Sequence, residues 1–212
     1  MYSELKDTVP DLNNKVALVT GAGRGTGQAI AIALGKAGAR VAVVDVNPDA
    51  AQRTADTIAQ AGGTAAVHTC DVTNKLAVQT MLYGVIEQWE RIDVLVNAAH
   101  VAPNSGALKM DEWEWNRTID VNLKSAFLLS QTAARAMKEA GGGVILNVVR
   151  PAEASAQAAV RAAREGLLGL TRALADEWRE FNVRVEILPT AADPAQTASE
   201  AVRICESIFG RG

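Results

Sequence analysis

The chain has 212 residues, of which 49% are hydrophobic and 21% are charged. Its formal net charge of −3 argues against nucleic acid as a partner, because such proteins need a basic surface. No run approaches the roughly 20 apolar residues of a membrane span, and two cysteines are too few for a disulfide framework. We therefore expect a cytoplasmic protein with a large hydrophobic core.

Strand and helix patterns alternate along most of the chain. Residues 1–14 are polar and are expected to form an N-terminal leader, and residues 15–212 a single domain. The expected strands are Val16–Thr20, Arg40–Asp45, Ala65–Cys70, Asp93–Asn97, Val144–Val149 and Val183–Leu188. The expected helices are Gln28–Ala37, Asp49–Ala61, Asn74–Trp89, Asp111–Glu139, Ser155–Phe181 and Ser199–Phe209. Asp111 and Glu114 have the spacing of a capping box.

The strand runs indicate a parallel sheet. Several are continuously apolar, which is typical of strands buried on both faces. Their alternation with helices predicts right-handed crossovers and an α/β fold of three layers. We expect a Rossmann-type doubly wound parallel sheet with the strand order 3-2-1-4-5-6. In such a sheet the ligand binds at the carboxyl ends of the strands, so the residues that follow each strand are the candidate site.

A glycine-rich turn follows the first expected strand. Gly21, Gly25 and Gly27 have the spacing G-x-x-x-G-x-G, just ahead of a helical segment. Glycines let a phosphate approach the backbone N–H groups at a helix start, so the turn predicts a pyrophosphate site. A tight turn without a ligand is the alternative. Asp45 ends the next strand, 18 positions after Gly27 (45 − 27), where a dinucleotide site carries the acid for its ribose.

Motifs at and beyond the strand ends resemble the short-chain dehydrogenase/reductase family. They are TGAGRGTG at 20–27, CDV at 70–72, DVLVNAA at 93–99, DVNL at 120–123, GLLGLTR at 166–172 and NVRV at 182–185. The resemblance runs from about Lys15 to Pro189. It implies a nicotinamide dinucleotide held by Gly21, Arg24, Gly25, Thr26, Gly27, Asp45, Val46, Asp71, Val72, Asn97, Ala98, Ala99 and Arg164. No metal site is expected.

Asp45 implies NAD rather than NADP as the cofactor. A carboxylate accepts hydrogen bonds from both ribose hydroxyls and repels a 2′-phosphate. Arg24 partly offsets this repulsion, so NADP is expected to bind less well rather than to be excluded.

The catalytic half departs from the family's pattern. The family uses Ser, Tyr and Lys, aided by Asn, and the Tyr hydroxyl acts as the general acid/base. Asn122 matches the Asn, but the other positions here are Arg150, Val160 and Arg164. No tyrosine follows Tyr83, so no shift of register restores the phenol. Valine has no ionisable proton and arginine stays protonated, so the usual hydride transfer is not expected.

Two features near the expected site leave alternatives open. His100 is a weak candidate for a replacement acid/base, because histidine titrates near neutral pH; the alternative is a surface or loop histidine. Arg150 and Arg164 either form an anion pocket or pair with Glu153 and Glu165. His68 is expected to be structural and Cys70 a small buried residue, while Trp113 and Trp115 are expected in a core or subunit contact.

Three functions remain open. The first is an NAD(H)-binding protein of this family without standard hydride transfer, which senses the cofactor or completes an oligomer. The second is an active oxidoreductase on an alcohol or carbonyl, with non-standard catalytic residues. The third is an interaction protein with an empty nucleotide cleft. The family also implies a homo-oligomer, a dimer or tetramer formed through the segments 111–139 and 155–181. The segment after Pro189 that covers the substrate is short, and the family's last strand is not evident.

Overall fold

The computed structural model describes residues 12–151 and 157–209. Its strands are β1 (Val16–Thr20), β2 (Arg40–Asp45), β3 (Thr64–Thr69), β4 (Val94–Asn97), β5 (Gly143–Val149) and β6 (Val183–Pro189). Its α-helices are α1 (Gly25–Lys36), α2 (Pro48–Gln60), α3 (Lys75–Trp89), α4 (Glu112–Ile119), α5 (Ser125–Glu139), α6 (Ala158–Glu177) and α7 (Pro194–Phe209).

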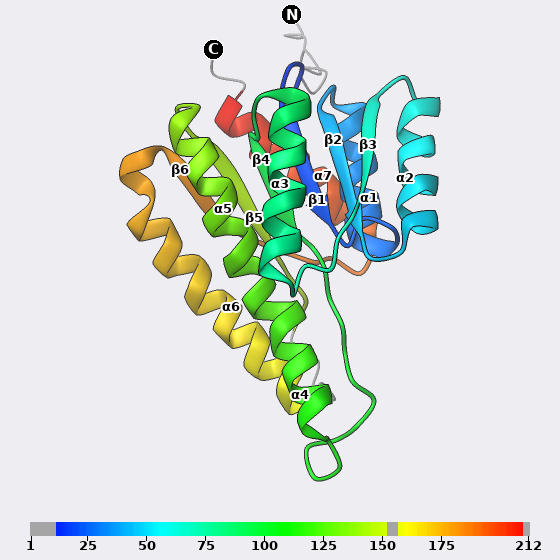
Figure 1. The fold of residues 1–212 in the computed structure, drawn as a ribbon, viewed down its shortest axis with the longest axis vertical. Helices are drawn as coiled ribbons and strands as arrows, with labels where there is room; N and C mark the ends of the chain where they lie inside the picture. The colour runs from blue at the N-terminus through cyan, green and yellow to red at the C-terminus, as the bar shows by residue number, and fades with distance from the viewer. Residues whose placement is uncertain (1–11, 152–156, 210–212) are drawn as a thin grey trace, which may run out of the picture.

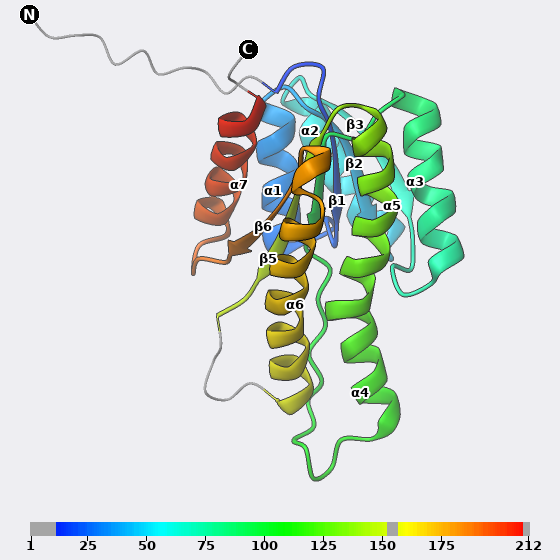
Figure 2. The same ribbon diagram turned by 90° about the vertical axis from the view of Figure 1, so that its left-hand side faces the viewer.

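The six strands form one parallel sheet with the order β3-β2-β1-β4-β5-β6, which confirms the predicted fold (Figure 1). Helices α1, α2 and α7 cover one face, and α3, α5 and α6 cover the other, as Figures 1 and 2 show. No further strand follows β6 among the described residues. Because all strands run the same way, their carboxyl ends lie at one edge of the sheet, which carries the loops of the candidate site.

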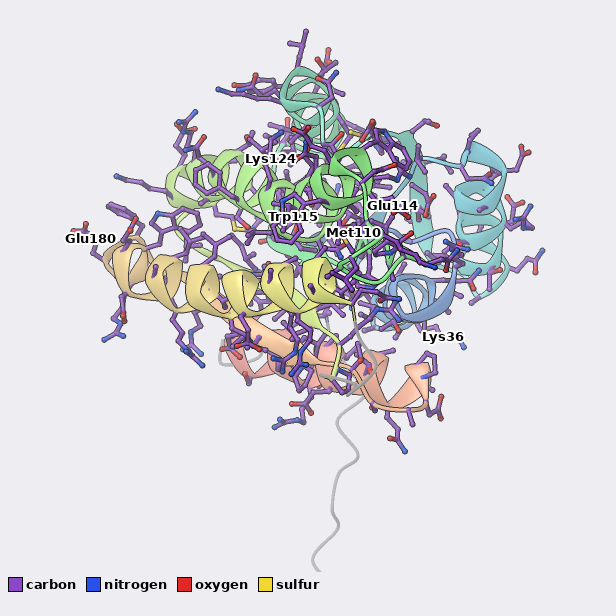
Figure 3. The ribbon with its side chains drawn as sticks, turned by 90° about the horizontal axis from the view of Figure 1, so that it is seen from below. Lys36, Met110, Glu114, Trp115, Lys124 and Glu180 are labelled. Carbon is purple, nitrogen blue, oxygen red and sulfur yellow. The ribbon has the colours of Figure 1, made fainter. Side chains whose placement is uncertain are left out.

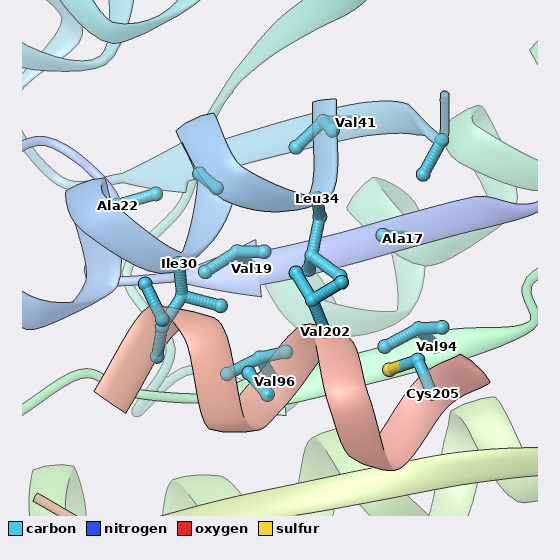
Figure 4. Packing of buried hydrophobic residues seen from close by; sticks show 14 of the residues in the cluster. Ala17, Val19, Ala22, Ile30, Leu34, Val41, Val94, Val96, Val202 and Cys205 are labelled. Carbon is cyan, nitrogen blue, oxygen red and sulfur yellow. The ribbon is translucent and has the colours of Figure 1, made fainter. Parts of the chain in front are cut away.

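Alternating side chains of the central strand β1 pack into the two helical layers. Ala17 and Val19 belong to the buried cluster that contains α1 and α7, and Val16 and Leu18 belong to the cluster that contains α3 and α5. Figure 4 shows Ile30 of α1 packed against other apolar side chains of the first of these clusters. Burial on both faces explains the continuous apolar runs in the sequence.

The predicted leader, residues 1–14, lies mostly outside the described residues. Its last part belongs to the fold: Leu12 is fully buried, and its N–H donates to the carbonyl oxygen of Ala37 at 2.7 Å. The domain therefore includes Leu12, ahead of the predicted boundary at residue 15.

Two predicted helix starts differ from the structure. Helix α1 begins at Gly25 instead of Gln28, so two glycines assigned to the turn form the first turn of the helix. Helix α7 begins at Pro194 instead of Ser199. Asp193 accepts a hydrogen bond from the N–H of Ala195 at 2.9 Å, and proline suits the first turn of a helix because it lacks an N–H.

The two long predicted helices are also interrupted. The segment 111–139 consists of α4, a π-helical turn at Asp120–Lys124, and α5. Asp111 caps α4 by accepting from the N–H of Glu114 at 2.7 Å, which is one of the two hydrogen bonds of the predicted capping box. In the segment 155–181, α6 is followed by a 3₁₀ turn at Arg179–Phe181, and residues 155 and 156 lie outside the described residues.

At the opposite edge of the sheet, buried Asp93 joins the segment before β4 to the start of β1. Its carboxylate accepts two hydrogen bonds from Arg91, at 2.5 and 2.8 Å, and one from the N–H of Val16 at 2.9 Å. The side chain of Asp93 is 2% exposed, so its removal leaves a buried donor unpaired at the start of β1.

We expect Asp93→Ala to lower the free energy of unfolding by about 2 to 3 kcal/mol, because it breaks a largely buried charged network. Urea unfolding followed by far-ultraviolet circular dichroism measures this change. Asp176→Ala is the control, since Asp176 pairs with Arg179 on the exposed surface and is expected to contribute little. Equal midpoints for the two variants would contradict the role of Asp93.

Candidate functional site

The turn between β1 and α1 requires glycine at two positions. Gly21 has φ +62°, and a Cβ there would lie 2.8 Å from Cα of Ala99. A Cβ on Gly27 would collide with the carbonyl oxygen of Gly21. The first turn of α1 therefore packs directly on the end of β1, with its N–H groups at the carboxyl edge of the sheet. This cradle, which a side chain would fill, fits a phosphate group.

Asp45 at the end of β2 faces the glycine turn. Its Oδ2 accepts from the N–H of Gly23 at 2.9 Å, and its Oδ1 accepts from the N–H of Asn47 at 3.0 Å. Each carboxylate oxygen has more than one acceptor site, so both can still accept from ribose hydroxyls. The two backbone bonds orient the carboxylate beside the turn.

A groove runs along this edge of the sheet and gathers most of the predicted cofactor residues. Eleven of the thirteen line it: Gly21, Arg24, Gly25, Thr26, Gly27, Asp45, Val46, Asp71, Val72, Ala98 and Ala99. The other two, Asn97 and Arg164, line an adjoining cavity. His100 and Arg150 line both spaces, so they lie where the groove meets the cavity.

Buried polar side chains tie the strand ends together beneath the groove. The hydroxyl of Thr20 donates to the carbonyl of Val96 at 3.3 Å and accepts from the N–H of Ala98 at 3.1 Å. Asn97 donates to Oδ1 of Asn147 at 2.8 Å and to Ser130 at 3.2 Å. These bonds hold the end of β4 against β1 and β5.

The adjoining cavity, called the inner cavity below, brings the predicted catalytic positions together. Asn122, Arg150, Val160, Arg164 and His100 all line it. Asn122 lies in the π-helical turn, and its amide donates to the carbonyl of Val101 at 2.7 Å and accepts from the same residue's N–H at 2.8 Å. Neither tyrosine nor lysine is among the described residues that line this cavity.

The interpretation of His100 as a group that titrates near neutral pH is corrected by its surroundings. Burial, and secondly the positive charge of Arg150, lower the pKa of His100 from 6.5 to about 4. At pH 7 the imidazole is therefore neutral and can accept a proton, but it is a weak base. Burial also lowers the pKa of His68, whose Nε2 has no hydrogen bond among the described residues.

The structure shows one of the two carboxylate pairings considered for Arg150 and Arg164. Arg164 forms an ion pair with Glu165, and its Nε donates to the carbonyl oxygen of Arg150 at 3.0 Å. Pairing with Glu165 is therefore present, while Glu153 lies outside the described residues. Arg161 also lines the inner cavity, and sequence analysis missed it. The signal was available, because Arg161 and Arg164 are three residues apart on one helix face.

Two other expectations, for Cys70 and for the two tryptophans, can be compared with the structure. Cys70 is buried, as predicted, and its thiol pKa is raised to about 11 by burial and by the charge of Asp71. A core position for the two tryptophans is wrong: Trp113 is 66% exposed and Trp115 is 42% exposed. Arg117 lies over the ring of Trp113, 5.5 Å from its centre. Ser125, missed by sequence analysis, lines the inner cavity.

Comparison with known proteins identifies the family. The family model described as short chain dehydrogenase matches residues 15–202, so the chain belongs to this family. It is 41% identical over 186 residues to D-threitol dehydrogenase of Mycolicibacterium smegmatis, covering 84% of this chain and 70% of that protein. It is 33% identical over 185 residues to NAD-dependent glycerol dehydrogenase of Listeria innocua, covering 85% of this chain and 71% of that protein.

Solved structures show the same fold. A metagenomic short-chain oxidoreductase in complex with NADP superposes with a TM-score of 0.87 and 35% identity, covering 92% of this chain and 91% of that one. The family binds nicotinamide dinucleotides, and the glycine cradle and groove described above fit such a group. Among the described residues, no helix is long and apolar enough to cross a bilayer, and no cluster of three or more potential ligands is placed to hold a metal ion.

The lowered pKa of His100 predicts a loss of stability in mild acid. Between about pH 6.5 and pH 4 the unfolded chain binds a proton at this position that the folded protein does not, so stability falls as the pH falls. We expect this histidine to contribute about 2 kcal/mol of destabilisation between pH 7 and pH 5. Urea unfolding at both pH values measures it, and His100→Gln should show a smaller pH dependence than the wild type. An unchanged dependence would contradict the lowered pKa.

Proposed function

We propose that this protein is an NAD(H)-dependent oxidoreductase that interconverts an alcohol and a carbonyl with catalytic residues that differ from the family's usual set. The observation that carries the proposal is Asp45, oriented by Gly23 and Asn47 beside the glycine cradle. The relatives named as dehydrogenases favour an active oxidoreductase over the interpretation without hydride transfer. The cradle and groove argue against an interaction protein with an empty cleft, because that interpretation assigns them no ligand.

The cofactor preference rests on charge. The carboxylate of Asp45 is suited to accept from a ribose diol and to repel a phosphate in the same place. Arg24 lines the same groove and offsets part of this repulsion. The glycerol dehydrogenase relative is named as NAD-dependent, while one structural neighbour is bound to NADP. We therefore propose NAD as the preferred cofactor and NADP as the weaker one.

In the proposed reaction, the bound nicotinamide supplies the hydride acceptor or donor. The proton of the alcohol goes to water or to a side chain of the inner cavity. Among the described residues that line this cavity, neutral His100 is the proposed proton acceptor, although its pKa of about 4 makes it a weak base. Asn122 holds the loop that carries His100, through its two hydrogen bonds to Val101. Arg164 is proposed to contact the cofactor from α6.

A second candidate is an NAD(H)-binding protein without turnover. One observation favours it: Val160 and Arg164 line the inner cavity at the positions where the resemblance places Tyr and Lys. A positioned acid/base contributes about 10²- to 10⁴-fold to a rate, and a base of pKa about 4 supplies only part of this. In that case the protein senses the cofactor or completes an oligomer.

We also propose a homo-oligomer formed through α4, α5 and α6. Exposed aromatic side chains on α4 and α5 support it, since Trp115 is 42% exposed and Phe127 is 38% exposed. Large apolar groups that face solvent on neighbouring helices are typical of subunit contacts.

The cofactor assignment predicts the result of a calorimetric titration. We expect NADH to bind at least about tenfold more tightly than NADPH, and Asp45→Asn to remove most of this preference because the repelling charge is lost. Asp49→Asn is the matched control, since Asp49 lies in the first turn of α2 and does not line the groove. Equal affinities of the wild type for both cofactors would contradict the assignment of Asp45.

Turnover separates the two candidate functions. We expect the wild type to reduce NAD with an alcohol, measured by absorbance at 340 nm, and His100→Ala to lower kcat by at least about tenfold. If the wild type binds NADH but oxidises no alcohol with NAD, while the double variant Val160→Tyr/Arg164→Lys does, the NAD(H)-binding protein without turnover is the better account. Full activity of His100→Ala would exclude His100 as the acid/base.

A further inference from the structure

Several positively charged side chains line the inner cavity. Three arginines line it, Arg150, Arg161 and Arg164, and no aspartate or glutamate is among the described residues that do so. His100, which like Arg150 lines both the inner cavity and the groove, is neutral at pH 7. The cavity therefore has an excess of positive charge.

The three guanidinium groups have different surroundings. Arg164 is held by Glu165 and by the carbonyl oxygen of Arg150, so Glu165 offsets one of the three charges. Arg150 and Arg161 have no carboxylate partner among residues 12–151 and 157–209. Both side chains are exposed, which places them at the open side of the cavity. Within the part of the chain that the structure describes, two positive charges are therefore without a carboxylate counter-charge there.

These arginines come from two elements that meet at the carboxyl edge of the sheet. Arg150 follows β5, and Arg161 and Arg164 lie in the first two turns of α6. Figure 3 views the molecule from this edge and shows α6, in yellow, beside α4. The hydrogen bond from Arg164 to the backbone of Arg150 fixes the two elements to each other at this point.

The rest of the cavity is largely apolar. Val121, Val160 and Leu167 form part of its wall, and Asn122 and Ser125 use their polar atoms on the backbone of neighbouring residues. A ligand that fits these walls has a small carbon skeleton with an anionic group directed to the arginines. A guanidinium group binds a carboxylate or a phosphate through two parallel hydrogen bonds. Arginine therefore binds these anions more strongly than it binds hydroxyl groups.

We propose that the inner cavity binds a small organic oxyanion, and that the substrate is an alcohol or carbonyl compound carrying a carboxylate or phosphate. The statement that the oxyanion is a substrate rests on the proposed function. The oxyanion-binding site itself does not depend on that function. Relatives are named for the neutral polyols D-threitol and glycerol. The arginines predict that this chain prefers the charged counterparts of such compounds. Oxidation of the alcohol leaves the anionic group unchanged, so alcohol and carbonyl forms bind in the same way.

A matched set of three-carbon probes tests the proposal. Glycerol, glycerate and glycerol 3-phosphate share a skeleton and differ in the neutral, carboxylate or phosphate group at one end. Each is titrated calorimetrically into the protein at low chloride, with and without NADH. We expect glycerate or glycerol 3-phosphate to bind at least about tenfold more tightly than glycerol, because a hydrogen-bonded charge pair is formed. The better of the two identifies which oxyanion the site takes.

Arg161→Gln is the test variant, since Arg161 lines the inner cavity but not the groove. We expect it to weaken oxyanion binding by about tenfold and to leave glycerol binding as weak as before. Arg172→Gln is the matched control, because Arg172 lies on the same helix and lines neither space. Melting temperatures of both variants show that the fold is intact.

The outcomes separate this proposal from the proposed function. Equal binding of the three probes, or unchanged oxyanion binding in Arg161→Gln, would overturn the oxyanion site even if NADH binds and alcohols are oxidised. Oxyanion binding that Arg161→Gln weakens and Arg172→Gln does not supports the site. If NADH does not bind in the same experiments, that site still stands, and it is the proposed oxidoreductase function that fails.

Discussion

The close packing of the first turn of α1 on the end of β1 is the constraint on which the site depends. Gly27 lies so near the carbonyl oxygen of Gly21 that a side chain cannot be placed between them, and Gly21 lies against Ala99 at the end of β4. This packing sets the helix start at the carboxyl edge of the sheet. It also holds the loop after β4, which carries His100, next to the glycine turn. The groove and the inner cavity are therefore neighbours because of these two backbone contacts.

Much of the fold is predictable from the sequence because it depends on local pattern. The apolar runs place all six strands within one residue at either end, because strands of a parallel sheet are mostly apolar where helices cover them. The π-helical turn is not predictable in this way. Its i→i+5 bonding accompanies the contact of Asn122 with Val101, 21 residues earlier, and no local pattern records that contact. The start of α1 was missed because glycine disfavours helices in general, although here it permits close packing.

The candidate site, like the fold, is predictable from the sequence only in part. Parallel topology brings the strand ends to one edge, so Asp45, Asp71 and the glycine turn could be expected together before the structure was known. The properties of individual groups depend on neighbours from other elements. The low pKa of His100 follows from burial and from Arg150, which lies 50 positions along the chain (150 − 100). The orientation of Asp45 depends on its hydrogen bond from the N–H of Gly23. The spacing of the glycines and Asp45 in the sequence does not predict this bond.

The two unusual properties of the inner cavity are physically linked. Burial is the larger cause of the low pKa of His100, and the charge of Arg150 is the second. An oxyanion bound at Arg150 opposes this second cause and leaves burial in place, so it raises the pKa of His100 toward 6.5 without reaching it. A stronger base transfers protons more readily near neutral pH. An anionic substrate would thereby improve the base that acts on it, whereas a neutral polyol would leave His100 as weak as it is in the free protein.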